Sequence, residues 1–327
     1  MVPREPRLVG AAARRPRRKH TARPRQKTRL TRMRLLLLGG TGQVGEELRS
    51  LPLPKDVELV APNRSSADLE DARAIAALVT EEQWSAVINA AAYTDVDRAE
   101  TEEPLAFALN ANAASVLAKE TGRRGIPVLH LSTDYVFDGR KGVPYVEADP
   151  PAPLNAYGRS KLAGELGVRA NNPRHVILRT SWVYSPYRKN FVRTILRLAA
   201  ERERLTIVAD QRGCPTSARE IARACLDIAI RCASEPDCTP YGLYHFTGGG
   251  EATWFEFAKA IIDIARVPRP PQVIPISTSE YPTAAIRPAD TRLDCTGVVR
   301  EFGIKMRPWP RSLADTIGRL LTHTSPP

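Results

Sequence analysis

The chain of 327 residues has a hydrophobic content of 43% and a charged content of 26%, which is ordinary for a globular protein and excludes a fibrous or low-complexity chain. Its formal net charge of +12 would suggest a nucleic-acid partner, but residues 1–32 hold twelve Arg or Lys and one acid, so this segment alone carries +11 and the rest only +1. Because the remainder is nearly neutral, it has no electrostatic footprint for nucleic acid, and we predict no nucleic-acid partner.

Residues 1–32 form a basic tail with several prolines, few apolar residues and no helical periodicity. Such a composition predicts disorder. Two interpretations stay open: the tail is a binding arm or targeting peptide, or translation starts at Met33, directly before a strand. The run RRPRRKH is not followed by an apolar stretch, which argues against an export signal.

No apolar run approaches the roughly 18 residues that a membrane span needs, so we predict no membrane partner. The longest run, LLLL at 35–38, has the length of a strand. The cysteines show no C-x-x-C pair and no histidine at metal-ligand spacing; they are Cys214, Cys225, Cys232, Cys238 and Cys295. This pattern favours reduced thiols in a cytoplasmic protein over disulfides or a zinc site, and no metal-binding residues are predicted.

From Met33 onward, short apolar runs alternate with helical segments. The predicted strands are MRLLLLG (33–39), VELVA (57–61), SAVINAA (85–91), PVLHLS (127–132), HVILRTS (175–181) and LTIVAD (205–210). The predicted helices between them begin at Gly42 and cover 69–83 and 104–122. Strands that are apolar throughout and alternate with helices indicate a parallel sheet covered on both faces. The predicted fold class is therefore α/β, with a doubly wound parallel sheet.

The last third of the chain differs in composition, with GLYHFTGGGEATW, a helical stretch to Ala265, a Pro-rich passage and a last helix over 312–323. We interpret it as a smaller C-terminal lobe over the carboxyl ends of the strands, where folds of this class bind ligands. The predicted division makes residues 33–180, completed by about 205–235, the cofactor-binding core. Residues of about 181–204 and 236–327 then form mainly the substrate-binding lobe.

The first strand runs into GGTGQVG, in which Gly39, Gly42 and Gly45 form G-x-x-G-x-x-G at a strand-to-helix junction. Glycines there permit a tight turn, close approach of backbone N–H groups to a pyrophosphate and close helix–strand packing, which favours a dinucleotide site over a plain turn. Asn63 and Arg64 follow the second strand, where an acid would favour NAD. An arginine there suits a 2′-phosphate, so we predict NADPH as the cofactor, with NADH as the alternative. The other candidate cofactor contacts lie near the ends of the first three strands and are Gln43, Val44, Asp68, Leu69, Ala90, Ala91, Ala92 and Thr94.

LSTDYVFDG follows the fourth strand, and Tyr157 and Lys161 stand four residues apart in NAYGRSKLAGE. Together with the glycine motif and NAAA, this set resembles the extended short-chain dehydrogenase/reductases, which have a Rossmann fold, from Met33 to the C-terminus. Within them, HLSTDYVFDG, PLNAYGRSKLAGE, RTSWVY, DQRGCPT and RPADTRLD resemble the dTDP-4-dehydrorhamnose reductase family. The resemblance implies a cytoplasmic enzyme that reduces the 4-keto group of a nucleotide-sugar substrate, dTDP-4-dehydro-L-rhamnose, with NADPH. Some members dimerise through Mg²⁺, and both a homodimer and Mg²⁺ stay open here.

The resemblance assigns catalytic roles to Thr133, Tyr157 and Lys161, of which Tyr157 and Lys161 would also bind the cofactor. Residues at positions i and i+4 of a helix share one face, so this Tyr and Lys can point together into the ligand crevice. A nearby ammonium would favour the phenolate and lower the pKa of Tyr157 from its usual value near 10. Tyr157 would then donate a proton to the C4 oxygen, Lys161 would hydrogen-bond the nicotinamide ribose, and Thr133 would orient the carbonyl in the role usually taken by serine.

Four further residues are candidate substrate contacts. Trp182 follows the fifth strand and would form an apolar wall for the sugar, or pack in the core. Asp134 would hydrogen-bond a sugar hydroxyl, or cap a turn. Arg287, in AIRPAD, would pair with the diphosphate, or lie on the surface. Asn190 would contact the nucleotide part of the substrate.

Two other functions compete with this interpretation. A nucleotide-sugar epimerase or dehydratase of the same superfamily is disfavoured, because a dehydratase typically has Thr-Asp-Glu where this chain has Thr133, Asp134 and Tyr135, and because those enzymes retain NAD. A non-catalytic protein that resembles the regulatory subunit of methionine adenosyltransferase is disfavoured by the intact set of Thr133, Tyr157 and Lys161.

Overall fold

The computed structural model describes residues 1–2, 32–63 and 68–324, with side chains described up to residue 322. The described residues from Arg32 onward belong to one compact unit. Two predictions lie outside the described residues: the disorder of the tail over 3–31 and the contact of Arg64 with a 2′-phosphate. No helix within the described ranges is long and apolar enough to cross a membrane.

The centre of the unit is a six-stranded sheet in the order β10-β5-β4-β3-β1-β2, in which every neighbouring pair is parallel. Its strands are β1 (Met33–Leu38), β2 (Val57–Val60), β3 (Ala86–Asn89), β4 (Val128–Thr133), β5 (His175–Thr180) and β10 (Gly242–His245). The leucines at 35–38 of β1 are each at most 2% exposed. Consecutive apolar side chains are buried because helices cover both faces of the sheet, which confirms the predicted doubly wound α/β fold.

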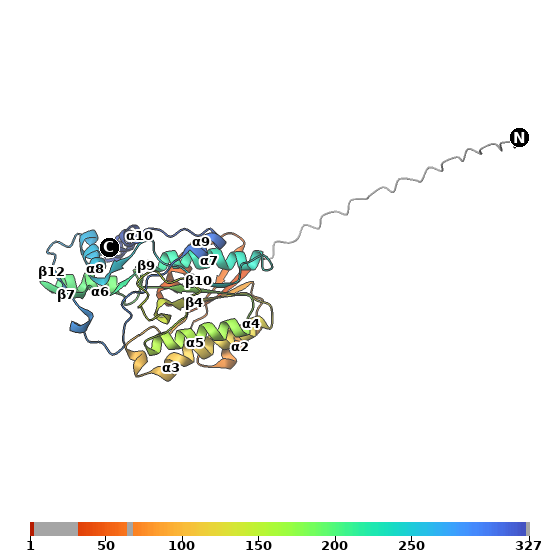
Figure 1. Ribbon diagram of the computed structural model, residues 1–327, viewed down its shortest axis with the longest axis horizontal. Helices are drawn as coiled ribbons and strands as arrows, with labels where there is room; N and C mark the ends of the chain where they lie inside the picture. Colours follow the sequence, from red (N-terminus) through yellow and green to blue (C-terminus); the bar gives the residue numbers. More distant parts are fainter. Residues whose placement is uncertain (3–31, 64–67, 325–327) are drawn as a thin grey trace. The chain divides into compact units, whose positions relative to one another are not determined.

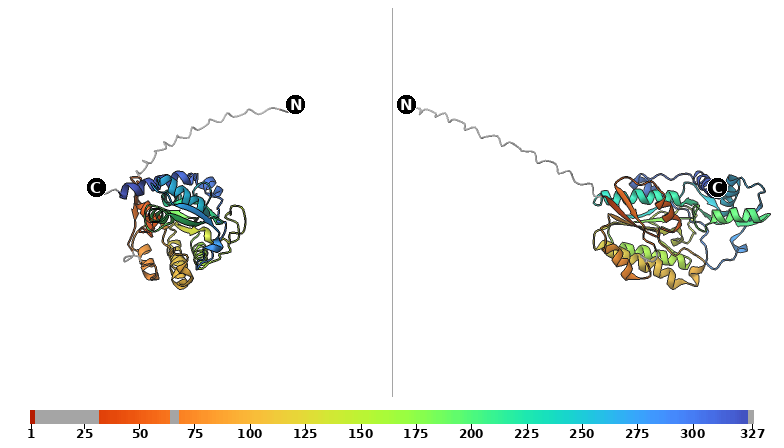
Figure 2. Two further views of the ribbon diagram at one scale, coloured as in Figure 1. Left: turned by 90° about the vertical axis from the view of Figure 1, so that its left-hand side faces the viewer. Right: turned by 180° about the vertical axis from the view of Figure 1, so that it is seen from behind.

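Helices lie above and below this sheet (Figures 1 and 2). Those that flank it are α1 (Gln43–Arg49), α2 (Ala72–Thr80), α3 (Glu103–Phe107), α4 (Ala113–Gly122), α5 (Ala156–Asn171), α7 (Ala218–Ser234) and α9 (Thr296–Phe302). On one face, Leu35 and Leu37 pack with α1 and α7, and on the other face Leu36 and Leu38 pack with α2 and α4. Successive side chains of a strand point to opposite faces, so one apolar strand serves two separate cores.

The predicted helix over 104–122 is divided into α3, a π-helical turn (Ala108–Asn112) and α4. In this turn the Asn110 side chain accepts a hydrogen bond from the backbone N–H of Tyr93 at 2.8 Å and donates one to Ser160 of α5 at 2.9 Å. A Cβ on Gly164 of α5 would lie only 2.1 Å from the carbonyl oxygen of Asn110, so a glycine is needed for this approach. These contacts fix α5, the helix that carries the Tyr–Lys pair.

A smaller lobe lies at one end of the sheet (Figure 1). Its helices are α6 (Phe191–Glu201), α8 (Trp254–Ala265) and α10 (Trp309–Thr324), which share an apolar cluster that includes Tyr184, Phe257 and Leu313. The short strands pair two by two, β6 with β9, β8 with β11 and β7 with β12. Their bounds are β6 (Val183–Tyr184), β7 (Arg204–Val208), β8 (Arg212–Gly213), β9 (Thr216–Ser217), β11 (Ala252–Thr253) and β12 (Gln272–Ile276).

One predicted strand has a different place in the fold. The strand expected over 205–210 forms as β7, but it pairs with β12 in the smaller lobe, and the sixth strand of the central sheet is β10, which pairs with β5. The prediction that 205–210 continues the central series is therefore wrong. An apolar strand suits any sheet that buries it, and here Leu205 and Val273 pack in the cluster of the smaller lobe.

Candidate active site

A cavity of about 700 Å³ lies where the carboxyl ends of the central strands meet residues of the smaller lobe. This volume falls in the range of small-molecule sites, roughly 300–1,000 Å³. The predicted site residues that line it are Gly39, Gly42, Gln43, Val44, Asn63, Asp68, Leu69, Ala90, Ala91, Ala92, Thr94, Thr133, Asp134, Tyr157, Lys161, Trp182 and Asn190. Gly45 and Arg287 do not line it.

The glycine-rich turn after β1 is shaped by close backbone contacts. Gly39 has a φ of +80°, and a Cβ on it would lie 2.6 Å from the carbonyl carbon of Ala90. A Cβ on Gly45 would lie 2.1 Å from the carbonyl oxygen of Gly39, to which the N–H of Gly42 donates at 2.9 Å. The turn therefore keeps bare backbone along the cavity, which fits a ligand that approaches the main chain closely, as a dinucleotide pyrophosphate does.

The same cavity continues past the end of β2, where Asn63, Asp68 and Leu69 line it. Asp68 accepts a hydrogen bond from the backbone N–H of Glu70 at 3.0 Å, which shapes the loop into α2. In folds of this class the adenosine ribose lies at this strand end. The preference for a 2′-phosphate that rests on Arg64 stays a prediction.

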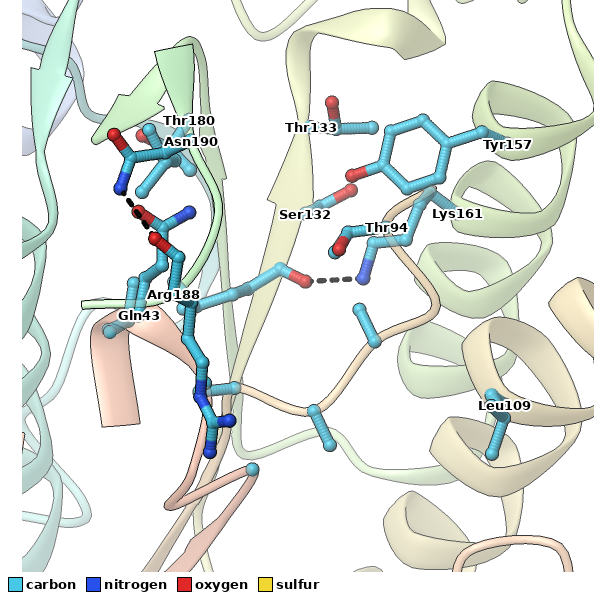
Figure 3. Close-up of a pocket in the computed structure, with 18 of the residues that line it drawn as sticks. Gln43, Thr94, Leu109, Ser132, Thr133, Tyr157, Lys161, Thr180, Arg188 and Asn190 are labelled. Atoms are coloured by element: carbon cyan, nitrogen blue, oxygen red, sulfur yellow. Dashed lines mark hydrogen bonds between the residues drawn. The ribbon is translucent and has the colours of Figure 1, made fainter. Parts of the chain in front are cut away.

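The predicted catalytic residues come together at the ends of β4 and α5. Asn155 caps α5 by accepting a hydrogen bond from the N–H of Gly158 at 2.8 Å, so the helix begins directly before Tyr157. Tyr157 and Lys161 project from neighbouring turns of α5 toward Thr133 and the end of β4 (Figure 3). The Nζ of Lys161, a residue only 2% exposed, donates to the carbonyl oxygen of Leu131 at 2.7 Å.

Burial sets the protonation of this pair. It raises the pKa of Tyr157 to about 12, against a smaller lowering by a side-chain hydrogen bond with Thr133. It lowers the pKa of Lys161 to about 8, against the opposing charge of Glu165. The prediction that Lys161 lowers the pKa of Tyr157 is wrong, because loss of hydration penalises the phenolate more than neighbouring groups favour it. At pH 7 the phenol is protonated and the amine is mostly charged.

A buried ion pair between Glu165 and Arg179 lies behind the Tyr157–Lys161 pair. Glu165, one turn beyond Lys161, accepts from Arg179 of β5 at 2.8 and 2.6 Å, and both side chains are at most 3% exposed. The hydroxyl of Ser132, next to Thr133, donates to the same carboxylate at 2.5 Å. One carboxylate thus connects α5, β4 and β5 directly behind the catalytic residues.

Asp134 is among the residues that line the cavity and is only 3% exposed. Its Oδ1 accepts a hydrogen bond from the hydroxyl of Thr133 at 3.1 Å, and its Oδ2 is buried. Burial raises the pKa of this carboxyl to about 6, and hydrogen bonds oppose the rise. The largest of these opposing effects is a side-chain hydrogen bond with Thr291, whose hydroxyl is also buried.

Trp182 both lines the cavity and packs in the smaller lobe. Its indole ring stacks on that of Trp254, with ring centres 3.5 Å apart and planes 4° from parallel. A Cβ on Gly213 would lie 2.5 Å from the Trp182 ring, so glycine makes room for this stack. Trp182 has a φ of +44°, which non-glycine residues adopt rarely and keep when the surroundings require it. Trp182 and Trp254 both line the cavity, and this stacked pair is called the indole wall.

Two predicted substrate contacts have partners within the chain. Asn190 lines the cavity, but its amide N donates to the carbonyl oxygen of Ser185 at 2.8 Å and its Oδ1 caps α6 by accepting from the N–H of Arg193 at 3.2 Å. Arg287 pairs with Asp97 through two hydrogen bonds of 2.7 and 3.1 Å. Neither side chain is free for a ligand unless these bonds open.

Several lining residues were not predicted from the sequence. Arg188 and Lys189 come from the segment between β6 and α6, Phe191 begins α6, and Trp254 begins α8. Arg188 and Lys189 directly precede Asn190, a predicted site residue, and this position in the sequence could have indicated that they line the cavity. For Trp254, which is 72 residues beyond Trp182 in the chain, the sequence carried no such signal.

The described residues contain no group of three or more His, Cys, Asp or Glu placed to hold a metal ion. All five cysteines are free thiols, and Cys238 alone among them is exposed.

The parallel sheet, the glycine-rich turn and the Tyr–Lys pair in one cavity define a Rossmann-fold oxidoreductase of the short-chain dehydrogenase/reductase type. The family model described as "RmlD substrate binding domain" matches residues 33–322. The chain therefore belongs to the dTDP-4-dehydrorhamnose reductase family, whose members are NAD(P)H-dependent oxidoreductases.

Individual relatives agree with this assignment. A dTDP-4-dehydrorhamnose reductase of Sinorhizobium fredii is 44% identical over 291 residues, which cover 88% of this chain and 98% of that protein. The solved structure of the Clostridium acetobutylicum enzyme of that name has a TM-score of 0.82 at 34% identity, with 88% of this chain and 100% of that chain covered. The Bacillus anthracis enzyme, solved in complex with NADP, has a TM-score of 0.81 at 34% identity, with 90% and 100% covered.

Proposed function

We propose that this chain reduces the 4-keto group of dTDP-4-dehydro-L-rhamnose with NADPH to give dTDP-L-rhamnose, and that Tyr157 donates the proton. The observation that carries the proposal is the single cavity that Tyr157, Lys161 and Thr133 share with the glycine-rich turn. Relatives carry this activity in their names, and the Bacillus anthracis relative was solved with NADP, which supports the substrate and the cofactor.

The cavity wall fits a dinucleotide, because the bare backbone at Gly39 and the close packing at Gly45 leave room along the turn. The residues that would hold the cofactor are Gly39, Gly42, Gln43 and Val44 at the pyrophosphate, Asn63, Arg64, Asp68 and Leu69 at the adenosine, Ala90, Ala91, Ala92 and Thr94 along the end of β3, and Tyr157 and Lys161 at the nicotinamide ribose. When bound, the cofactor supplies a hydride to the carbonyl carbon.

The protein supplies the proton and orients the carbonyl. With a pKa of about 12, Tyr157 is fully protonated at neutral pH and is ready to donate to the C4 oxygen as that oxygen becomes an alkoxide. Lys161 would act mainly by hydrogen-bonding the nicotinamide ribose, because the neighbouring groups that act on the pKa of Tyr157 are Thr133 and Asp134. Thr133 would donate a hydrogen bond to the same oxygen and hold the carbonyl in line with the phenol, once its hydroxyl has turned away from Oδ1 of Asp134.

The substrate side of the cavity is formed by Asp134 and the indole wall. The carboxylate of Asp134 would accept a hydrogen bond from a sugar hydroxyl, and Trp182 would lie against the sugar. For Asn190 and Arg287, contact with the nucleotide and the diphosphate would require the partner bonds inside the chain to open.

We also propose that the two parts of the chain divide the binding work. Residues 33–180, completed by about 205–235, would bind the cofactor, and about 181–204 and 236–327 would bind mainly substrate. Trp182, Asn190 and Trp254 line the cavity from the second group, which supports this division. Two strands depart from this division: β10 lies in the second group by sequence but in the central sheet by structure, and β7, at the start of 205–235, lies in the smaller lobe.

The test is NADPH oxidation at 340 nm with enzymatically prepared dTDP-4-dehydro-L-rhamnose, with NADH in parallel. We expect turnover that prefers NADPH and falls at least about 10²-fold in Tyr157→Phe, since general acid catalysis contributes typically 10²–10⁴-fold. The variant should bind NADPH and unfold at the same temperature as the parent chain. A folded parent chain that binds NADPH but turns over no 4-keto nucleotide sugar would contradict the proposal and favour a non-catalytic binding role.

A further inference from the structure

The segment from Ser185 to Asn190 lies against the glycine-rich turn, although about 145 residues separate them in the chain. The hydroxyl of Ser185 donates to the side-chain oxygen of Gln43 at 2.9 Å. The Nε of Arg188 donates to the carbonyl oxygen of Thr41 at 2.8 Å. The arginine lines the cavity on the side opposite Tyr157 and Lys161 (Figure 3).

The backbone of this segment is held in an unfavourable conformation. Arg188 has a φ of +56°, in the left-handed region that favours glycine. The amide of Asn190 donates to the carbonyl oxygens of Ser185, Tyr187 and Arg188 at 2.8, 3.0 and 3.3 Å and so fixes the turn. A left-handed non-glycine residue that its surroundings force into place is a feature of ligand-binding loops, and here it directs a cation at the turn.

The charge of Arg188 is not neutralised by the protein. The residue is exposed, and across the described ranges its guanidinium forms no ion pair. By contrast, the neighbouring Arg219 and Arg319 both pair with Glu47. With Nε engaged by Thr41, the two terminal nitrogens of Arg188 stay available at the cavity.

We propose that Arg188 binds a phosphate oxygen of the cofactor pyrophosphate and acts as a cationic clamp from the smaller lobe. A planar guanidinium suits phosphate oxygens, and its contact with Thr41 places it at the first strand-to-helix turn, where this fold class holds the pyrophosphate. The 2′-phosphate would lie at the end of β2, near Asn63, and the substrate diphosphate on the far side of the nicotinamide. The inference rests on the proposed function, because it assumes a dinucleotide in the cavity.

Arg188→Gly is the informative variant, because glycine adopts a φ of +56° without strain and the chain should fold at least as stably. The matched control is Arg266→Gly, which removes an arginine with a φ of +51° at the end of α8, away from the cavity lining. Dissociation constants for NADPH, NADH and dTDP are measured by titration calorimetry on the full chain, at low and high salt. Thermal unfolding of each variant without ligand is measured alongside.

We expect Arg188→Gly to weaken NADPH and NADH equally, by about tenfold at low salt and less at high salt, as loss of one charge-assisted contact predicts. Its affinity for dTDP and that of Arg266→Gly for all three ligands should be unchanged. If Arg188→Gly lost affinity only for NADPH, Arg188 would be assigned to the 2′-phosphate, and if it lost affinity only for dTDP, Arg188 would be assigned to the substrate. Either result overturns the inference, and so does unchanged affinity for all three ligands. If the parent chain binds neither dinucleotide, the proposed function fails as well, whereas parent-like binding by Arg188→Gly refutes only the clamp.

Discussion

The buried ion pair behind the catalytic residues gives a sharp prediction. Glu165→Gln keeps the shape of the side chain but removes the charge that faces Arg179, whose side chain is 3% exposed. The guanidinium is then a buried cation without a counter-charge, and the hydroxyl of Ser132 donates to a weaker acceptor. Breaking one side of a buried pair typically costs about 3–5 kcal/mol.

The expected shift in melting temperature follows from the size of the compact unit. At about 2.1 cal/mol/K per residue, roughly 300 residues have an unfolding entropy of about 0.6 kcal/mol/K. A loss of about 3–5 kcal/mol therefore lowers the Tm by about 5–8 °C. Turnover should fall as well, since the same carboxylate holds Ser132 beside Thr133 and faces Lys161 across one helical turn.

Differential scanning calorimetry and urea unfolding measure the loss of stability. The control is Glu201→Gln, which removes the acid of the pair with Arg197 on α6, where the side chains are 51% and 61% exposed. An exposed i,i+4 pair contributes only about 0.3–0.5 kcal/mol, so its Tm should barely change. The double variant Glu165→Met with Arg179→Met should recover most of the loss, because it removes the buried guanidinium together with its counter-charge.

Equal losses of stability in Glu165→Gln and Glu201→Gln would show that the buried ion pair does not stabilise the chain in this way. A double variant less stable than Glu165→Gln alone would show that the two side chains do not act as a pair.

Two further predictions concern the cofactor side and the catalytic lysine. Burial lowers the pKa of Lys161 from 10.5 to about 8. Between pH 8 and pH 10.5 the unfolded chain therefore holds this proton more tightly than the folded chain does. The contribution of Lys161 to the free energy of unfolding then rises as the pH increases from about 8 to 10.5. The free energy of unfolding of the parent chain, relative to that of Lys161→Met, should therefore increase by about 2 kcal/mol between pH 7.5 and pH 10. If urea unfolding showed a difference that does not change with pH, the lowered pKa of Lys161 would be contradicted. Gly45→Ala places a Cβ 2.1 Å from the carbonyl oxygen of Gly39, so it should lower the Tm by several degrees and weaken NADPH binding. Gly318→Ala in α10, where nothing lies within 4 Å of the new Cβ, should instead stabilise the chain by up to about 1 kcal/mol; equal effects of the two substitutions would argue against a packed turn.

The sequence by itself determined the features that depend on local pattern. Strands such as Leu35–Leu38 are apolar at every position, and only a sheet buried on both faces satisfies that pattern. The glycines of GGTGQVG predicted a turn with bare backbone, and the spacing of Tyr157 and Lys161 predicted that one helix presents both to the same crevice. The structure has each of these features, because each follows from the geometry of neighbouring residues along the chain.

The tertiary structure alone decided what depends on contacts between distant segments and on burial. It placed β7 in the smaller lobe, stacked Trp254 on Trp182, brought Arg188 to the glycine-rich turn and engaged Arg287 with Asp97. It also reversed the expected shift of the Tyr157 pKa. The spacing of Tyr157 and Lys161 along one helix suggests that the ammonium attracts the phenolate. The loss of hydration depends instead on every element that packs around the phenol, and no local pattern in the sequence contains that information.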